Sequence, residues 1–344
     1  MASTNKIGII ETIRGLAALA VCLFHFSLCK ISFKGSPQYF FKAASYGWLG
    51  VEAFFVVSGF IIPYSLAKAN YRLAQFFRFF AKRCIRIEPA YLISIVFVIG
   101  LRYLVEKVPG FKGAPVQLSI RNVLLHIGYL PEHFGYKWLL PVYWSLEAEF
   151  YYYILIGLCF VFIWKNNVNL LIGIVLALTA GFFIPLSVFI FMPFFIMGII
   201  TCAKKTGKIN DYIFYTVMAA AFIGCLFNGQ GYIPATIGLI AGLLIAYVEF
   251  KTVVTDFLGK ISFSLYLMHV PVGGKVLNYL GRYTNNEWQV WGSLVLALAI
   301  TIAASWIFYK LVEYPSQMLS KRISYNRDEK STDHITTLPT GLYT

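Results

Sequence analysis

Arg14 and His25 are the residues whose types and spacing most directly suggest chemistry. Both lie inside the first long apolar run, where a buried arginine or histidine is costly and therefore points to function. Eleven residues make about three turns of an α-helix, so the two side chains point the same way, roughly 16 Å apart along its axis. One helix face thus offers a cation at one depth and a proton-transfer group at another. This suits a long anionic substrate whose reactive end lies at the histidine, although Arg14 could instead pair with Glu11.

Glu149 is the expected partner of His25. It lies near the start of an apolar run that we expect to cross the membrane in the opposite direction, which puts it at about the depth of His25. A carboxylate can orient an imidazole and stabilise its charged form, and such a histidine can remove a proton from a hydroxyl. The sequence therefore predicts His25 and Glu149 as catalytic residues. The alternative is an interfacial acid and a histidine that packs between helices.

The composition excludes an ordinary soluble domain. Hydrophobic residues make up 59% of the 344 residues and charged residues only 13%, and the mean hydropathy is +0.70. Apolar runs without strand-like alternation predict an all-α, polytopic membrane protein. The net charge of +14 is typical of basic loops that orient membrane helices, so we expect no nucleic-acid partner. The six cysteines are scattered in apolar runs and predict neither a disulfide framework nor a metal site.

Ten membrane spans are expected, with ends good to a few residues. They cover about 8–28, 47–67, 88–105, 142–164, 168–184, 186–203, 211–227, 231–249, 258–279 and 289–313, with tight turns near Pro185 and Asn228-Gly229. Segment 118–130 could form a partial or re-entrant helix. About twice as many basic residues fall in the inner loops if both termini are cytoplasmic, which favours that orientation. We expect one transmembrane domain over 1–323 and a polar, disordered tail over 324–344.

A second set of polar residues could contact substrate. Arg83 and Arg86 lie three residues apart on one helix face, and guanidinium groups suit phosphate, although a basic loop before a span needs no such explanation. The positions that we expect to contact substrate are Trp144, Ser145, Tyr152 and His269. Of these, His269 could equally cap the helix break before Pro271.

Six motifs in order resemble the membrane-bound acyltransferase 3 family, bacterial enzymes that O-acylate polysaccharides and lipid-linked glycans. They are RGLAALAVCLFH, FFVVSGFII, RCIRIEPAY, YWSLEAEFYY, ISFSLYLMH and VEYP, spread over 14–315. The resemblance implies transfer of an acyl group, usually acetyl, from cytoplasmic acyl-CoA to a glycan hydroxyl across the inner membrane. It maps the essential arginine and histidine of the family onto Arg14 and His25, its acyl-CoA arginines onto Arg83 and Arg86, and its glutamate onto Glu149.

The resemblance also sets the expected partners. They are acyl-CoA as donor substrate, a glycan or lipid-linked glycan as acceptor and membrane lipid, without a metal and with a homo-oligomer as an open alternative. Direct transfer and an acyl-His25 intermediate both stay open, because histidine can act as a nucleophile. The competing function is a glycan transporter or flippase, since polar residues within the membrane also mark permeation paths.

Overall fold

The computed structural model describes residues 8–29, 37–107 and 119–324, and every regular element within these ranges is a helix. The α-helices are α1 (Gly8–Ser27), α2 (Gln38–Ala44), α3 (Gly50–Lys68), α4 (Phe76–Glu106), α5 (Ile120–Ile127), α6 (Trp144–Ile163), α7 (Asn167–Phe183), α8 (Ser187–Ile190), α9 (Met192–Lys205), α10 (Asp211–Phe227), α11 (Tyr232–Tyr247), α12 (Val253–Met268), α13 (Lys275–Leu280), α14 (Glu287–Phe308) and α15 (Tyr314–Lys321). Short 3-10 turns are η1 (Gly47–Leu49), η2 (Leu73–Gln75) and η3 (Glu132–Phe134), and π-helical turns are η4 (His269–Gly274) and η5 (Tyr309–Glu313).

Five helical stretches are long and apolar enough to cross a membrane. They are Gly8–Ser27, Gln38–Lys68, Leu73–Glu106, Trp144–Ile163 and Glu287–Lys321. Shorter apolar helices include α10 and α11. The all-helical prediction is confirmed for the described residues, and α1, α6, α7, α10 and α11 end within two residues of the expected bounds. The count of ten crossings, the cytoplasmic termini and the single domain stay predictions. The expected tail, from residue 325 onward, lies outside the described residues.

Prolines lie at three of the helix breaks. Pro185 disfavours helix at the residue before it and separates α7 from α8, at the turn that we expected there. The range 186–203, which we expected to hold one span, contains α8 and the longer α9, and α9 has a proline at its N-terminus. Pro271 lies inside the π-helical turn between α12 and α13, and Pro315 follows the turn between α14 and α15. Because proline has no N–H, it interrupts the regular α-helical bonding, and a wider turn accommodates the change.

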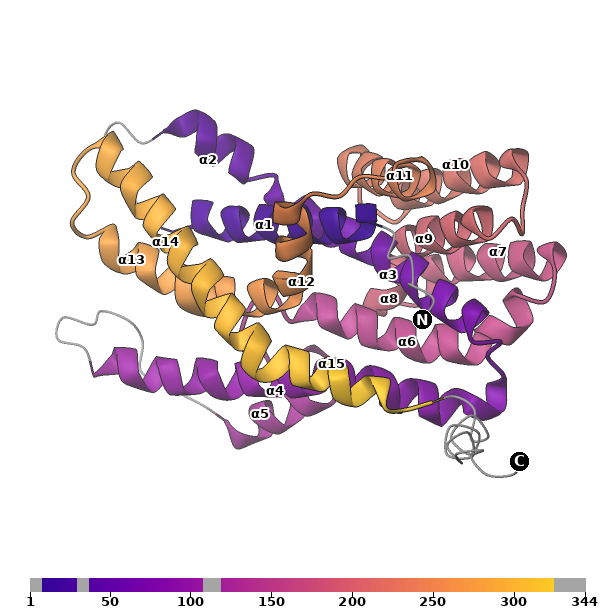
Figure 1. The fold of residues 1–344 in the computed structure, drawn as a ribbon, viewed down its shortest axis with the longest axis horizontal. Coiled ribbons are helices and arrows are strands. Elements are labelled where there is room, and N and C mark those ends of the chain that lie inside the picture. Colours follow the sequence, from indigo (N-terminus) through magenta and orange to yellow (C-terminus); the bar gives the residue numbers. More distant parts are fainter. Residues whose placement is uncertain (1–7, 30–36, 108–118, 325–344) are drawn as a thin grey trace, which may run out of the picture.

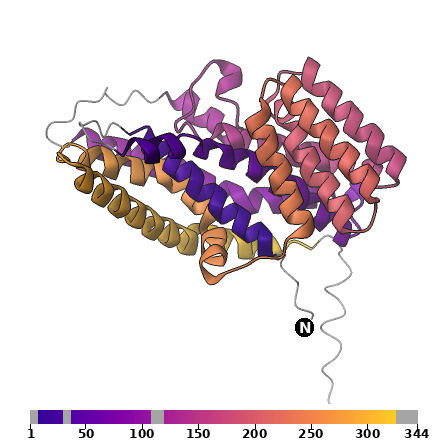
Figure 2. The same ribbon diagram turned by 90° about the horizontal axis from the view of Figure 1, so that it is seen from above.

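The helices form two groups. Figures 1 and 2 show α7, α9, α10 and α11 gathered beside the rest of the protein. Helix α9 packs against α3, α10 and α11, while α12 packs against α1 and α14, and α15 against α4. Helices α1, α3, α4, α6 and α12 therefore surround the middle of the protein, where the polar residues singled out above converge.

Helices α1 and α12 run parallel in a fixed register. A Cβ added to Gly259 would lie 2.4 Å from the Glu11 carbonyl oxygen, and one added to Gly15 would lie 2.9 Å from the Gly259 nitrogen. Only glycine allows the backbones to come this close. At the other end of the helices His25 meets His269, at an offset of 244 residues, the same as that between Gly15 and Gly259. The close glycine crossing thus sets which residues face each other further along.

The segment after α4 folds back onto the middle of that helix. The Tyr129 hydroxyl donates to Glu88 Oε1 at 3.0 Å, and the Tyr91 hydroxyl donates to the His126 carbonyl oxygen at 3.1 Å. His126 Nε2 in turn accepts the Leu139 N–H at 3.0 Å. A short helix is therefore present in segment 118–130, as expected, and it packs against the middle of α4.

Candidate active site

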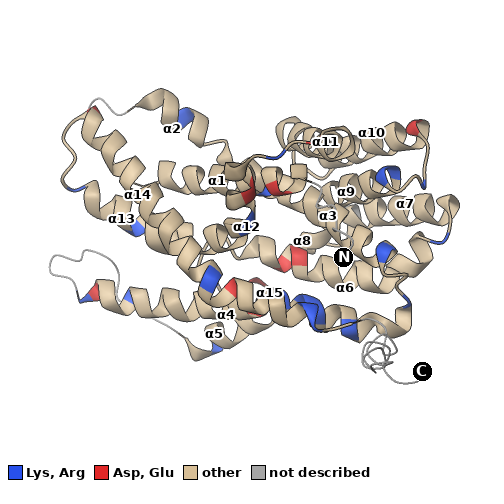
Figure 3. Ribbon diagram, viewed as in Figure 1, with Lys and Arg blue, Asp and Glu red and all other residues tan. Residues whose placement is uncertain are grey.

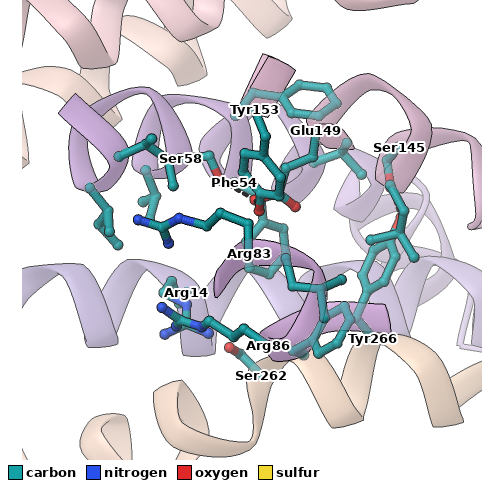
Figure 4. Close-up of a pocket in the computed structure, with 18 of the residues that line it drawn as sticks. Arg14, Phe54, Ser58, Arg83, Arg86, Ser145, Glu149, Tyr153, Ser262 and Tyr266 are labelled. Carbon is teal, nitrogen blue, oxygen red and sulfur yellow. Dashed lines mark hydrogen bonds between the residues drawn. The ribbon is translucent and has the colours of Figure 1, made fainter. Parts of the chain in front are cut away.

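A narrow central cavity lies between α1, α3, α4, α6 and α12, with η5 and α15 along one side (Figure 4). Its volume is about 110 Å³. The polar residues that line it are Arg14, Ser58, Arg83, Arg86, Ser145, Glu149, Tyr153, Ser262, Tyr266, Glu313 and Gln317. Five of the residues predicted from the sequence, namely Arg14, Arg83, Arg86, Ser145 and Glu149, therefore meet in one place.

Arg83 and Arg86 form no direct ion pair with a described residue, although Glu313 lines the same cavity and acts electrostatically on Arg86. Among the described residues, neither guanidinium forms an ion pair, whereas Arg14 lies 3.3 Å from Glu11. Arg83 is only 7% exposed, and its Nη2 donates to Ser65 Oγ at 2.8 Å while its buried Nε has no partner. Buried charges are normally paired. The two unpaired cations therefore favour an anionic ligand.

Glu149 is held by two neighbouring hydroxyl groups. Ser58 Oγ donates to Glu149 Oε1 at 2.6 Å, and the Tyr153 hydroxyl donates to the same oxygen at 2.5 Å. Figure 4 shows the carboxylate together with Ser58 and Tyr153 on the wall opposite Arg14 and Arg86. Because both bonds use Oε1, Oε2 can accept a hydrogen bond from a ligand in the cavity.

Ser145 and Tyr266 close the cavity away from the arginines. Their hydroxyl oxygens lie 2.6 Å apart, and the Tyr266 hydroxyl also donates to the Val142 carbonyl oxygen at 3.0 Å. The Tyr266 ring centroid lies 5.8 Å from that of His269. This end of the cavity is therefore next to the His269 ring.

A wider basic vestibule adjoins the cavity at the arginines. Its volume is about 850 Å³, and it shares Arg14, Ile61, Arg83, Arg86 and Gln317 with the central cavity. Seven basic residues line it against one acidic residue: Arg14, Lys68, Lys82, Arg83, Arg86, Lys260 and Lys321 against Glu11. Figure 3 shows the basic segments of α4 and α15 side by side in this region. Such a surface attracts anions.

His25 is paired with His269 and not, as we expected, with Glu149. His269 Nε2 lies 3.1 Å from His25 Nδ1, and the ring centroids are 4.8 Å apart. Glu149 instead bonds to Ser58 and Tyr153. The predicted hydrogen-bonded pair of His25 and Glu149 is thus wrong, because a shared depth in the membrane does not put two side chains on facing sides of their helices.

Two other expected contact residues lie outside the central cavity. Trp144 packs its ring against Phe191, at 5.0 Å between centroids. Tyr152 is 1% exposed, and its ring stacks on Phe195 at 4.1 Å. Both serve packing in this structure, so their contact with substrate stays a prediction.

Four further residues that line the cavity were not among the predicted site residues, namely Ser58, Tyr153, Tyr266 and Glu313. The two tyrosines have a signal in the sequence: Tyr153 follows Glu149 by one helical turn, and Tyr266 precedes His269 by three residues. Glu313, in the closing VEYP, is 2% exposed and accepts hydrogen bonds from the Ser264 N–H and Oγ. Glu313 therefore joins η5 to α12 at the cavity wall. Among the described residues, no group of three or more His, Cys, Asp or Glu could hold a metal ion.

Comparison with known proteins identifies the family. An acyltransferase domain matches residues 7–310. The "Putative acetyltransferase ORF330" of Acidianus two-tailed virus is 27% identical over 76% of this chain and 82% of its own length. "O-acetyltransferase OatA" of Staphylococcus aureus is 24% identical over 89% of this chain, which spans only 56% of OatA. No solved structure matches significantly. The domain match covers nearly the whole sequence, so the protein belongs to the acyltransferase 3 family of membrane acyltransferases.

Proposed function

We propose that this protein transfers an acyl group, in the first place acetyl, from cytoplasmic acyl-CoA across the cell inner membrane to a hydroxyl of a polysaccharide or lipid-linked glycan. His25 is the general base, and the protein is a multi-pass enzyme. The donor enters at the basic vestibule, and the acceptor reaches His25 from the other side. No metal takes part.

The two unpaired guanidinium groups carry this proposal. Arg83 and Arg86 stand where the vestibule of about 850 Å³ narrows into the cavity of about 110 Å³. Acyl-CoA has a bulky nucleotide with phosphates at one end and a thin arm with a thioester at the other. Its phosphates would pair with the arginines, which suit phosphate geometry. Its arm would then follow the narrow cavity towards Ser145 and Tyr266.

Glu149 would act on the arm of the donor. With Oε1 held by Ser58 and Tyr153, its Oε2 can accept a hydrogen bond from an amide N–H of the arm. This role replaces the orientation of His25 that we expected from the sequence. Glu149 then contacts the donor but does not move a proton.

Acyl transfer needs one base that takes a proton from the acceptor hydroxyl and then gives it to the leaving thiolate. His25 removes the proton of the acceptor hydroxyl, and the oxygen attacks the thioester carbonyl carbon. The new C–O bond forms, the C–S bond breaks, and the CoA thiolate takes the proton from His25. In the acyl-histidine variant, His25 first attacks the carbonyl itself and the acceptor then takes the acyl group.

Reconstitution tests the proposal. Purified protein in liposomes receives radiolabelled acetyl-CoA in the compartment that the vestibule faces and an acceptor polysaccharide in the other. The wild-type protein should label the polysaccharide, and His25→Ala should lose about 10²- to 10⁴-fold of the rate, the usual contribution of a general base. His133→Ala, a histidine that lines neither cavity, is the control and should keep the rate.

Two results would overturn it. Full-rate labelling by His25→Ala would remove the histidine from the reaction. Movement of unmodified glycan without transfer of the label would make the protein a transporter. Mass spectrometry of surface glycans with and without the gene would then identify the acceptor.

A further inference from the structure

The two histidines make matching contacts with their own helices. His25 Nδ1 lies 3.0 Å from the Val21 carbonyl oxygen, and His269 Nδ1 lies 3.1 Å from the Leu265 carbonyl oxygen. Each carbonyl belongs to the residue four positions earlier. The contact between the rings is the third, from His269 Nε2 to His25 Nδ1 at 3.1 Å.

These contacts determine where the protons lie. A carbonyl oxygen can only accept, so each Nδ1 that faces one carries the hydrogen. A neutral imidazole has a single ring hydrogen, which leaves His269 Nε2 bare and able to accept the His25 Nδ1–H. If both rings instead carried the hydrogen on Nε2, each bare Nδ1 would point its lone pair at a carbonyl oxygen, of Val21 or of Leu265, and the two contacts would be repulsive. The bonded arrangement of neutral rings therefore leaves His25 Nε2 without a hydrogen.

We propose that His269 is the positioning residue of the catalytic base: its Nε2 accepts the His25 Nδ1–H and thereby presents a bare His25 Nε2 to the acceptor hydroxyl. This inference rests on the proposed function of His25. The His25 Nδ1–H is then shared between two acceptors, the Val21 carbonyl oxygen at 3.0 Å and His269 Nε2 at 3.1 Å. The Val21 carbonyl also accepts the backbone N–H of His25 within α1, so His269 supplies the acceptor that has no other donor from α1. It also stabilises the positive ring that forms when His25 takes a proton.

A neutral partner suits this buried position. His269 is 0% exposed, and an ionised carboxylate there would carry a large desolvation cost. An imidazole acceptor holds the ring of His25 without adding a charge. It also stabilises the charged form less than a carboxylate would, so His25 gives the proton back to the departing thiolate more readily.

The architecture holds the pair in place. The crossing of Gly15 and Gly259 sets the register between the parallel α1 and α12, and His25 and His269 lie opposite each other at the same offset of 244 residues. His269 is also the first residue of the π-helical turn η4. Such turns are frequent at functional sites.

Two variants of His269 separate positioning from packing. His269→Gln places an amide oxygen near the position of Nε2 and can still accept the His25 Nδ1–H. His269→Phe keeps a ring of similar size but offers no acceptor. We expect His269→Gln to keep kcat within about threefold and His269→Phe to lose about tenfold or more, a part of the whole contribution of the base. The KM for acyl-CoA should not change, because His269 does not line the donor cavity.

Nitrogen-15 NMR of histidine-labelled protein reads the tautomer without any assay of activity. His126 is an internal reference: its Nδ1 faces the Asn122 carbonyl at 2.8 Å, and its Nε2 accepts the backbone N–H of Leu139 at 3.0 Å. A backbone N–H can only donate, so the neutral His126 ring carries its hydrogen on Nδ1. Wild-type His25, assigned from the signals lost in His25→Gln, should match His126, and His269→Phe should move only the His25 signals.

The outcomes divide clearly. A His25 ring with its hydrogen on Nε2, or equal kcat in wild type and His269→Phe, would overturn the inference while leaving the base itself in place. Equal losses of kcat in the Gln and Phe variants would assign His269 to packing and also overturn it. Full activity of His25→Ala would instead overturn the proposed function, and the NMR comparison would still show whether His269 orients the ring.

Discussion

Removal of the two unpaired arginines tests the donor site. In the variant Arg83→Gln with Arg86→Gln, both cations at the junction of the vestibule and the central cavity are replaced by neutral side chains that can still form hydrogen bonds. The arginines contribute no ion pair with the described part of the chain. The double substitution should therefore lower the affinity for an anionic ligand more than it lowers the folding stability of the protein.

The size of the effect follows from the geometry. A hydrogen bond to a charged group contributes about 1.5–3 kcal/mol, and each 1.4 kcal/mol is a tenfold change in Kd. Each lost arginine–phosphate contact should therefore raise the Kd for CoA by about 10- to 100-fold. Because the two arginines share one ligand and lie one turn apart, their effects are coupled, and we expect about 100-fold or more for the pair.

Calorimetric titration of CoA into protein in nanodiscs measures this Kd. Arg121→Gln is the matched control, because Arg121 lies over the rings of Phe134 and Tyr136, at 6.0 and 5.9 Å, and lines neither cavity. Pantetheine, which has no phosphate, should bind the wild type and the double variant alike. A double variant that binds CoA as tightly as Arg121→Gln does would refute the assignment of the phosphates to these arginines.

Two further predictions concern the cavity wall and the helix packing. Glu149→Gln should lower kcat/KM for acyl-CoA by roughly tenfold, and Ser58→Ala by less, because Tyr153 still holds the carboxylate; equal losses in steady-state assays would contradict this order. Gly59→Ala should destabilise the protein by about 1–3 kcal/mol, because the new Cβ would lie 2.3 Å from the Phe195 carbonyl oxygen. Gly100→Ala, with nothing within 4 Å, is the control, and similar melting temperatures for both would contradict the packing argument.

The sequence predicted the helices well where composition alone decides them. The apolar run 211–227 matches α10, and the turn at Asn228-Gly229 is present, with Gly229 at φ +75°. It failed where one residue changes the bonding within a run. A window of hydropathy averages over Pro271, inside the expected span 258–279, yet the N–H that this proline lacks is what widens the helix there.

The sequence predicted several of the residues that line the central cavity, but it did not predict which side chains bond to each other. Buried charge is costly enough that Arg14, Arg83, Arg86 and Glu149 each stood out, and the structure brings all four to one cavity. Their partners depend on the rotation of each helix about its axis. Hydropathy and basic loops give the depth of a residue, and neither gives that rotation.

The register between α1 and α12 shows what links the cavity to the histidines. Ser262, Tyr266 and His269 follow one another at intervals of four and three residues, so they lie on one face of α12. The first two line the cavity, and the third bonds to His25. The same face therefore runs from the central cavity to His25, parallel to the stretch from Arg14 to His25 on α1. The spacing of Arg14 and His25 gains its meaning from this second helix, because α1 carries the proposed base and the neighbouring helix carries His269, the residue that we propose orients it.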